Sequence, residues 1–403
     1  MLALALAIMS GACGDSGSSN SVAPTTTEIA SATTGTAATT TSTTVEGQLP
    51  VGPSALETIS AAEFPAPLVD VTAIISGGPP PDGIPPLDNP VFIPVSASDA
   101  ALAPNEPVVV LEIDGDARAY PVQVMIWHEI VNDTVGGIPV AVTYCPLCNS
   151  AVSYVREVRG VETTFGTSGR LYASALVMYD RATESLWTHF DGRAVVGLVA
   201  GDQLEVVPSP LMSWSDFQND YPDGLVLDPT QTGFSRDYGR NPYFGYDDDS
   251  TEPFLFLGDA DDRAAAKLRV VGVAIDDAAV AYSLDAIRAD GVAATNAEVG
   301  MTDIVIFWLE GQASALDEER IEHGRDVGTV GVFSARIDNR LHTFEVVDGE
   351  IRDAETGSTW TVSGEAIAGE LAGRELRRIP HLDTFWFAWA TYRPGTALVE
   401  DIG

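Results

Sequence analysis

Two closely spaced cysteines are the residues of this chain best suited to chemistry. Cys145 and Cys148 belong to the run Tyr-Cys-Pro-Leu-Cys at 144–148. At this spacing both sulfur atoms can reach one metal ion, or they can close a small disulfide ring. The third cysteine, Cys13, follows an apolar leader and is expected to be a lipidation site. The pair at 145 and 148 is therefore where a functional interpretation begins.

The N-terminal part of the chain predicts export. Residues 1–13 resemble a bacterial lipoprotein signal, with an apolar stretch too short to span a bilayer as a helix. Residues 14–60 are rich in Ser and Thr and predict a disordered linker, and residues 61–105 form a Pro-rich extension of the folded domain. We expect an exported lipoprotein, at the cell surface or in the periplasm, held at the membrane through its lipid anchor.

The charge of the chain restricts its partners. The sequence has 58 acidic and 21 basic residues and a net charge of -37. Nucleic acids and anionic membrane surfaces would repel such a protein. We therefore exclude nucleic-acid binding and expect the folded part to bind a small ligand or a metal ion.

A repeated pattern divides the folded part into two halves. The turn Asp-x-x-Thr-x-Ser-x-Trp that begins at Asp180 recurs at Asp353. Eight further positions between Gly192 and Pro222 recur at one constant offset between Gly364 and Pro394. The pattern predicts an internal duplication, with a first half over 106–267, connector included, and a degenerate second half over 268–403.

Most of the folded sequence favours strands. Segments such as 108–113, 139–144 and 304–308 are short, β-branched or aromatic, and bounded by Gly, Pro or Asp. Helical patterns are few, at 121–132, 210–220 and 314–323. We expect an α+β fold that is predominantly β, with a sheet from each half. The cysteine pair would then lie in the turn of a hairpin.

The second half serves as an internal control for site residues. It has no counterpart of His128 or of the loop that contains Ser168, and its strand carries Trp308 where the first half has Cys145. Features that both halves share are expected to be scaffold, whereas features confined to the first half are expected to form the site. This favours His128, Ser168 and the two cysteines as a group.

A metal site is the first interpretation of that group. Two thiolates and an imidazole suit Cu(I) or Zn(II), so Cys145, Cys148 and His128 are the predicted ligands. Further residues could complete or line the site, and they are Asp180, Arg181, Ser168, His189, Arg240 and Tyr243.

Other interpretations stay open at this point. The cysteine pair could perform thiol–disulfide exchange, or it could form a static disulfide that pins the hairpin. The Arg- and Tyr-rich segment 236–246 could bind a glycan or an anionic ligand. Ser168, a histidine and Asp180 are also the residue types that a hydrolase uses, although no signature spacing is present. Whether the protein is an enzyme is left open.

Several long motifs resemble those of the DUF3179 family. They are the runs at 127–133, 136–140, 143–151, 165–169, 176–181 and 238–243, and the Pro-rich run at 76–88. The resemblance covers roughly residues 70 to 400. Because DUF3179 is a domain of unknown function, the resemblance implies no established activity, cofactor or catalytic residue.

Overall fold

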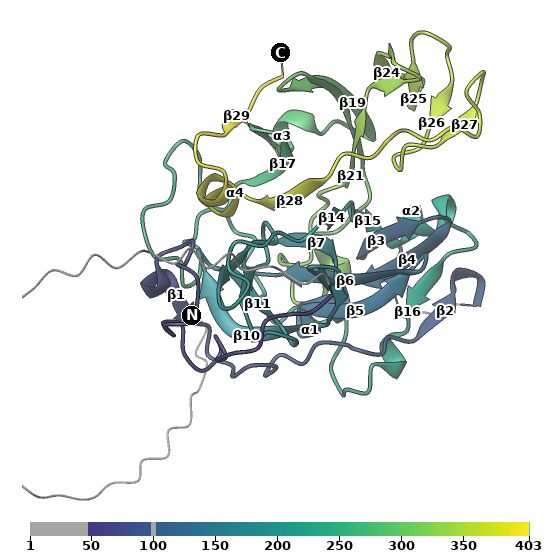
Figure 1. The fold of residues 1–403 in the computed structure, drawn as a ribbon. Helices are drawn as coiled ribbons and strands as arrows, with labels where there is room; N and C mark the ends of the chain where they lie inside the picture. The colour runs from purple at the N-terminus through teal and green to yellow at the C-terminus, as the bar shows by residue number, and fades with distance from the viewer. Residues whose placement is uncertain (1–46, 98–101, 403) are drawn as a thin grey trace, which may run out of the picture. The chain divides into compact units, whose positions relative to one another are not determined.

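The computed structural model describes residues 47–97 and 102–402, which are mainly strands (Figure 1). This confirms the predicted predominance of β structure. Its α-helices are short and are α1 (Val122–His128), α2 (Trp214–Asp220), α3 (Leu284–Ile287) and α4 (Trp386–Tyr392). Its 3-10 turns are Val71–Ala73, Val95–Ala97, Pro229–Gln231 and Ile321–His323. Among the described residues, no helix combines the length and the apolar composition needed to cross a membrane.

One four-stranded sheet carries the cysteine pair. Its strands, in spatial order, are β14 (Val206–Val207), β7 (Ser150–Val155), β6 (Ile138–Cys145) and β5 (Ile130–Val135). Strands β6 and β7 are antiparallel, and Cys145 pairs with Ser150. The cysteines therefore lie at the turn of a hairpin, as the sequence predicts.

Two five-stranded sheets complete the first half, and the N-terminal extension contributes a strand to each. The first contains β1 (Ile74–Ser76), β10 (Phe165–Tyr172), β11 (Ala175–Asp180), β12 (Leu186–Thr188) and β13 (Ala194–Val196). The second contains β15 (Leu211–Ser213), β3 (Pro107–Ile113), β4 (Asp116–Pro121), β16 (Leu225–Leu227) and β2 (Phe92–Pro94). A small ribbon pairs β8 (Glu157–Val158) with β9 (Val161–Glu162). The extension is thus an integral part of the first half.

The second half is built from three sheets and a ribbon. The first sheet contains β28 (His381–Phe385), β17 (Arg269–Ile275), β18 (Ala278–Ser283) and β29 (Ala397–Val399). The second contains β19 (Val292–Val299), β20 (Thr302–Leu309) and β21 (Thr329–Ser334), and the third contains β24 (Phe344–Val347), β25 (Glu350–Asp353), β26 (Thr359–Trp360) and β27 (Ala366–Ala368). The ribbon pairs β22 (Arg336–Ile337) with β23 (Arg340–Leu341). Strand β28 lies against β7, the strand that follows the cysteine turn (Figure 1).

The largest hydrophobic core joins the cysteine hairpin to the second half. It combines Val142, Tyr144 and both cysteines with Phe385 and Trp386, all of them buried. Burying a large apolar side chain stabilises a fold by about 1.5–3 kcal/mol. This shared core holds the hairpin turn in a dry environment.

The three predicted helices differ from the structure in extent or in kind. Residues 314–323 form no α-helix, because the carbonyls of Leu316, Asp317 and Glu319 accept hydrogen bonds from the backbone of the 241–247 connector. The helix predicted over 121–132 ends at His128, since Glu129 has a φ of 59° that cannot continue a right-handed helix. The helix predicted over 210–220 is present only over 214–220, as α2, because residues 211–213 form strand β15.

The folded part also begins earlier than the sequence suggests. Ala55, within the predicted linker over 14–60, is fully buried, and its N–H donates to the Glu184 carbonyl at 3.2 Å. Leu56 packs beside it against a small cluster on β11 and β12. The packed chain therefore includes residues before 61. The predicted signal and Cys13 lie outside the described residues.

Candidate functional site

The cysteine turn is compact and buried. Cys145 is the last residue of β6, Cys148 lies in the four-residue loop, and both are free thiols that are almost fully buried. The N–H of Asn149 donates to the Pro146 carbonyl at 3.3 Å. Asn149 has a φ of 48°, in the left-handed region that asparagine tolerates better than most residues. The local sequence thus favours a tight turn that holds the two sulfur atoms together.

The two thiols differ in acidity. Burial raises the pKa of Cys145, but hydrogen bonds from the Cys148 thiol and from the backbone N–H of Leu176 outweigh it, so the pKa is lowered overall. The Leu176 nitrogen lies 3.4 Å from the Cys145 sulfur. Burial and the neighbouring Cys145 raise the pKa of Cys148 well above its ordinary value. Cys145 is therefore the first of the pair to lose its proton.

A chain of hydrogen bonds leads away from Cys148 through buried polar side chains. The Cys148 sulfur lies 3.0 Å from the Ser150 hydroxyl, which lies 2.9 Å from Nε2 of His189. Nδ1 of His189 lies 2.8 Å from the Thr143 hydroxyl, which donates to the Val152 carbonyl at 2.6 Å. Burial lowers the pKa of His189 to about 3, so the imidazole is neutral.

The direction of these bonds follows from the Thr143 end. Because Thr143 uses its proton on a carbonyl, it accepts from His189 Nδ1–H, and Nε2 is left as an acceptor. Ser150 then donates to Nε2, and its hydroxyl oxygen is free to accept the Cys148 thiol proton. His189, a predicted site residue, thus lies at the cysteine turn with Ser150 between it and the sulfur.

Glu129 and Tyr243 flank Cys145. Glu129 is buried, and burial together with the charge of Cys145 raises the pKa of its carboxyl group well above the ordinary value. Burial also raises the pKa of Tyr243, and the charges of Glu129 and Cys145 add to this effect. Burial therefore favours the uncharged form of both side chains beside Cys145. Tyr243 was a predicted site residue, and the structure places it here.

Contacts from outside the first half's sheets fix the backbone of the turn. The Cys148 carbonyl accepts from the Thr384 hydroxyl at 2.7 Å and from the Phe385 N–H at 3.2 Å, and both donors lie on β28. The Leu147 carbonyl accepts from the Tyr246 hydroxyl at 3.0 Å. The second half, expected to be a degenerate scaffold copy, therefore supports the cysteine turn directly.

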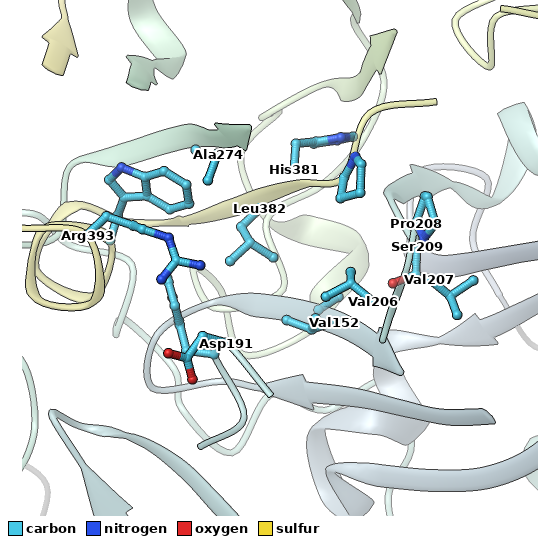
Figure 2. Close-up of a pocket in the computed structure, with 15 residues that line it drawn as sticks. Val152, Asp191, Val206, Val207, Pro208, Ser209, Ala274, His381, Leu382 and Arg393 are labelled. Carbon is cyan, nitrogen blue, oxygen red and sulfur yellow. The ribbon is translucent and has the colours of Figure 1, made fainter. Parts of the chain in front are cut away.

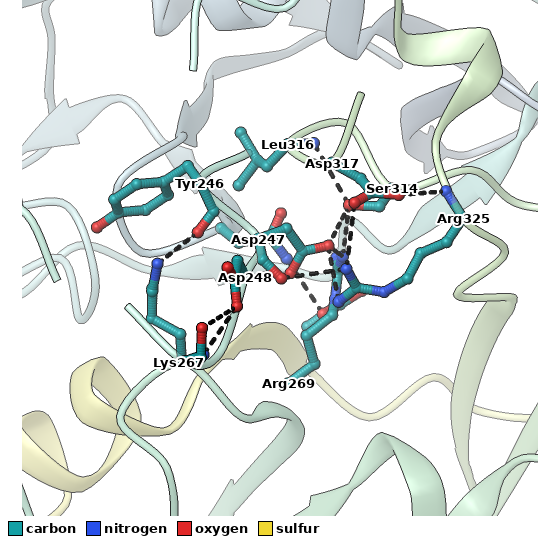
Figure 3. Close-up of polar contacts among 12 residues, drawn as sticks. Tyr246, Asp247, Asp248, Lys267, Arg269, Ser314, Leu316, Asp317 and Arg325 are labelled. Atoms are coloured by element: carbon teal, nitrogen blue, oxygen red, sulfur yellow. Dashed lines mark hydrogen bonds and ion pairs between the residues drawn. The ribbon is translucent and has the colours of Figure 1, made fainter. Parts of the chain in front are cut away.

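A largely buried ion-pair network, with Arg325 half exposed at its edge, lies next to these contacts (Figure 3). Asp247 pairs with Arg269 at 3.1 Å and with Arg325 at 3.0 Å, and its carboxylate also accepts from the Ser314 hydroxyl. Arg269 reaches Asp383 on β28 at 3.3 Å. Asp383 in turn accepts from the side-chain amide of Asn149 at 3.2 Å. The network thus connects the connector segment to the cysteine turn.

A small cavity borders β7 (Figure 2). Its volume is about 120 Å³, and its lining includes Val152, Leu382 and Asp191, toward which the Arg393 guanidinium points. Ala151 also lines it. Neither Cys145 nor Cys148 is among the residues that line this cavity.

His128 has a different environment from the one predicted. Its Nδ1 lies 2.7 Å from the Pro85 carbonyl and its Nε2 lies 2.7 Å from the Tyr238 hydroxyl, so both ring nitrogens are used. Within the described residues, one group of three metal-ligating side chains has its ligand atoms within 4.8 Å of one another, and it contains neither His128 nor a cysteine. The geometry does not bring His128 together with the two sulfurs.

The other first-half features hold the segment 76–90, which we call the strap. Beside the Ser168 loop, the Thr167 carbonyl accepts from the Asp82 N–H at 2.8 Å, and the Thr167 hydroxyl donates to the Ile84 carbonyl at 2.8 Å. Ser168 itself donates to the Val177 carbonyl. A Cβ atom added at Gly169 would lie 2.0 Å from the Pro79 carbonyl oxygen, so only glycine fits. Residues of the first half that have no counterpart in the second half therefore include residues that bind the strap as well as residues of the cysteine site.

Three more predicted site residues have structural partners elsewhere. Arg181 binds the strap, with Asp88 at 2.8 Å and Asp82 at 3.2 Å. The Asp180 carboxylate accepts hydrogen bonds from its own turn, including the indole N–H of Trp187 at 2.9 Å. Arg240 is exposed and pairs with Glu319 at 3.2 Å. The structure does not place these three at the cysteine turn.

Replacing Arg181 with Met is expected to loosen the strap. The change removes both ion pairs to Asp82 and Asp88, which are partly exposed and contribute about 1 kcal/mol together. Hydrogen exchange should become faster at the amides of Asp82 and Leu87, which bond to the first half. The control is Arg159→Met, which removes a comparable pair with Asp202 far from the strap in sequence. Equal exchange in the two variants would contradict the assignment.

Sequence reasoning missed several residues of the site. The strand pattern could have identified Ser150 and Thr143. Thr143 lies two residues before Cys145 and so on the same face of β6, and Ser150 pairs with Cys145 across the hairpin. Glu129 and Thr384 have no comparable signal. Glu129 is placed beside Cys145 by its unusual φ angle, and Thr384 contacts Cys148 because the two halves pack together.

Comparison with known proteins identifies a family and no described activity. The model of the DUF3179 family, described as a protein of unknown function, matches residues 81–396. No curated protein and no solved structure matches this chain.

Proposed function

We propose that this chain, which belongs to the DUF3179 family, binds the thiophilic metal ion Cu(I) through Cys145 and Cys148. The observation that carries the proposal is the state of the two sulfurs. They are free, buried and close enough for the Cys148 thiol to turn from Ser150 and donate to a negative Cys145. A metal ion that replaces the two thiol protons gains two thiolate ligands with little movement of the turn.

The number of ligands favours copper over zinc. Structural zinc sites take four ligands, usually cysteine and histidine. In the described part of the chain, neither sulfur belongs to a group of three His, Cys, Asp or Glu ligand atoms that all lie within 4.8 Å of one another. Two thiolates suffice for the soft ion Cu(I), which also tolerates a dry surrounding.

The hydrogen bonds at the turn support loss of the two thiol protons. Metal binding requires both cysteines as thiolates. The backbone N–H of Leu176 stabilises a negative Cys145, and the Ser150 hydroxyl can turn to donate to a negative Cys148. Polar groups thus face both sulfurs although the site is buried.

We further infer an exported lipoprotein with two related halves. Asp353 accepts from the indole N–H of Trp360 at 3.1 Å, as Asp180 does from Trp187 at 2.9 Å. In each half this aspartate pairs across two strands with a phenylalanine. These matched contacts support an internal duplication, with the cysteine pair in the first copy.

Thiol–disulfide exchange is the second candidate. The lowered pKa of Cys145 beside the raised pKa of Cys148 is the asymmetry expected of an attacking and a resolving thiol. Burial of both sulfurs opposes it, since exchange requires access to the attacking sulfur.

A static disulfide would require the two free thiols to oxidise. For the segment 236–246 no observation favours glycan binding, because Arg240 and Tyr238 already have protein partners.

Anaerobic titration of the reduced chain with Cu(I), against a coloured Cu(I) chelator, tests the proposal. A Cys13→Ser background restricts the thiol count to the pair. One Cu(I) per chain is expected, and it should be lost in Cys145→Ser and in Cys148→Ser. His128→Gln is the matched control and should retain the copper. Two free thiols without copper uptake would contradict the proposal, and no free thiols without metal would indicate a disulfide.

A further inference from the structure

We propose that His342, Asp353 and Glu355 form a separate site for a divalent transition-metal ion such as Zn²⁺. Nδ1 of His342 lies 3.3 Å from an Asp353 carboxylate oxygen and 3.7 Å from a Glu355 carboxylate oxygen. All three ligand atoms lie within 4.8 Å of one another. The site does not depend on the cysteine pair, which is in the other half of the chain.

The spacing of the three atoms fits a metal ion. Zinc binds nitrogen and oxygen at 2.0–2.1 Å, so two tetrahedral ligands lie roughly 3.3–3.4 Å apart. The observed 3.3 and 3.7 Å are close to this value. An ion could therefore be bound with little movement of the side chains.

Neighbouring donors orient both carboxylates. Asp353 accepts from the Thr356 N–H at 2.7 Å and from the Trp360 indole N–H at 3.1 Å. Glu355 accepts from the Thr343 N–H at 2.9 Å. Such outer hydrogen bonds fix ligand orientation in metal sites.

The first half shows that the turn itself needs neither His342 nor Glu355. Phe165 pairs with Asp180 as Phe344 pairs with Asp353. Two positions before Phe165 the first half has a threonine, and two positions after Asp180 it has an alanine. The turn at Asp180 therefore forms without a metal-ligating side chain at either position. In the second half both positions carry metal-ligating types, and they converge on the shared aspartate.

Charge and exposure define the kind of ion. Asp353 and His342 are buried, whereas Glu355 is exposed and leaves one side open to solvent. A neutral imidazole and two carboxylates carry two negative charges, which a divalent cation neutralises. Imidazole and carboxylate ligands select borderline divalent ions such as Zn²⁺ or Co²⁺ over Cu(I).

Titration of the full chain with Co²⁺ tests the site, because its visible absorption reports on ligands. We expect one Co²⁺ per chain with d–d bands and without the strong near-ultraviolet sulfur band. The double variant Cys145→Ser/Cys148→Ser should bind as tightly as the parent. His342→Ala should lose binding, and Glu355→Gln, at an exposed position that spares the fold, should weaken it at least about tenfold.

His323→Ala is the matched control. His323 lies 3.9 Å from Glu322 on the surface of the same half, and its loss should leave binding unchanged. Unaltered Co²⁺ binding in both His342→Ala and Glu355→Gln would overturn the proposal. So would the absence of binding by the folded parent chain, which would leave His342 as an ion-pair partner only. Neither result bears on Cu(I) uptake, which is measured separately.

Discussion

Replacing Arg269 with Met is expected to destabilise the protein by about 3–5 kcal/mol, the range for removing one partner of a buried ion pair. Arg269 is almost fully buried and pairs with both Asp247 and Asp383. Methionine fills much of the volume but leaves two buried carboxylates with less compensation. The cost arises from these charges rather than from a cavity.

The effect should extend to the cysteine turn. Asp383 holds the side chain of Asn149, so a displaced Asp383 releases the residue that follows Cys148. Chemical denaturation measures the free energy of unfolding, and thiol labelling measures exposure of the pair. Arg263→Met is the control, because Arg263 is largely exposed and its pair with Asp261 should contribute under about 1 kcal/mol. Equal losses in the two variants would refute the role of the network.

Replacing His189 with Gln should change how stability depends on pH. Burial lowers the pKa of His189 from 6.5 to about 3, so between these values the unfolded chain binds more protons than the folded protein. Stability therefore falls as the pH is lowered from 6.5 toward 3, by up to about 5 kcal/mol for this group. Glutamine keeps one donor and one acceptor but does not titrate, so this contribution should disappear.

The comparison of the two proteins isolates His189. Burial raises the pKa of Glu106 to about 7 and that of Asp220 to about 6, and these groups favour the folded state at acid pH. They are present in both proteins and cancel in the difference. Unfolding free energies at pH 7, 5 and 4 should show the gap shift in favour of the variant as the pH falls. A gap that is constant with pH would show that His189 is not buried as a neutral imidazole.

The hairpin at the cysteines could be predicted because its signal is local. Alternating β-branched residues on both sides of Pro146 specify two strands and a turn. The helix predicted over 314–323 is absent for a reason that lies elsewhere in the chain. Its carbonyls bond to the connector at 241–247, and no local pattern reports that pairing.

The site was only partly predictable for a similar reason. Comparing the halves selected the cysteines, but it also selected His128 and the Ser168 loop, which hold the strap. The second half lacks counterparts both of residues that contact the N-terminal extension and of residues that contact a sulfur. The comparison therefore cannot separate these two kinds of residue. The contacts from Thr384 and Asp383 to the turn come from β28, more than two hundred residues further along the chain. They depend on how the two halves pack.

X-ray absorption at the copper edge of the Cu(I)-loaded chain tests the central proposal most directly. We predict a first shell of two sulfur atoms without nitrogen or oxygen ligands, unchanged in His128→Gln and absent in Cys145→Ser/Cys148→Ser. A shell dominated by nitrogen or oxygen, or one that persists when both cysteines are replaced, would contradict Cu(I) binding by this pair.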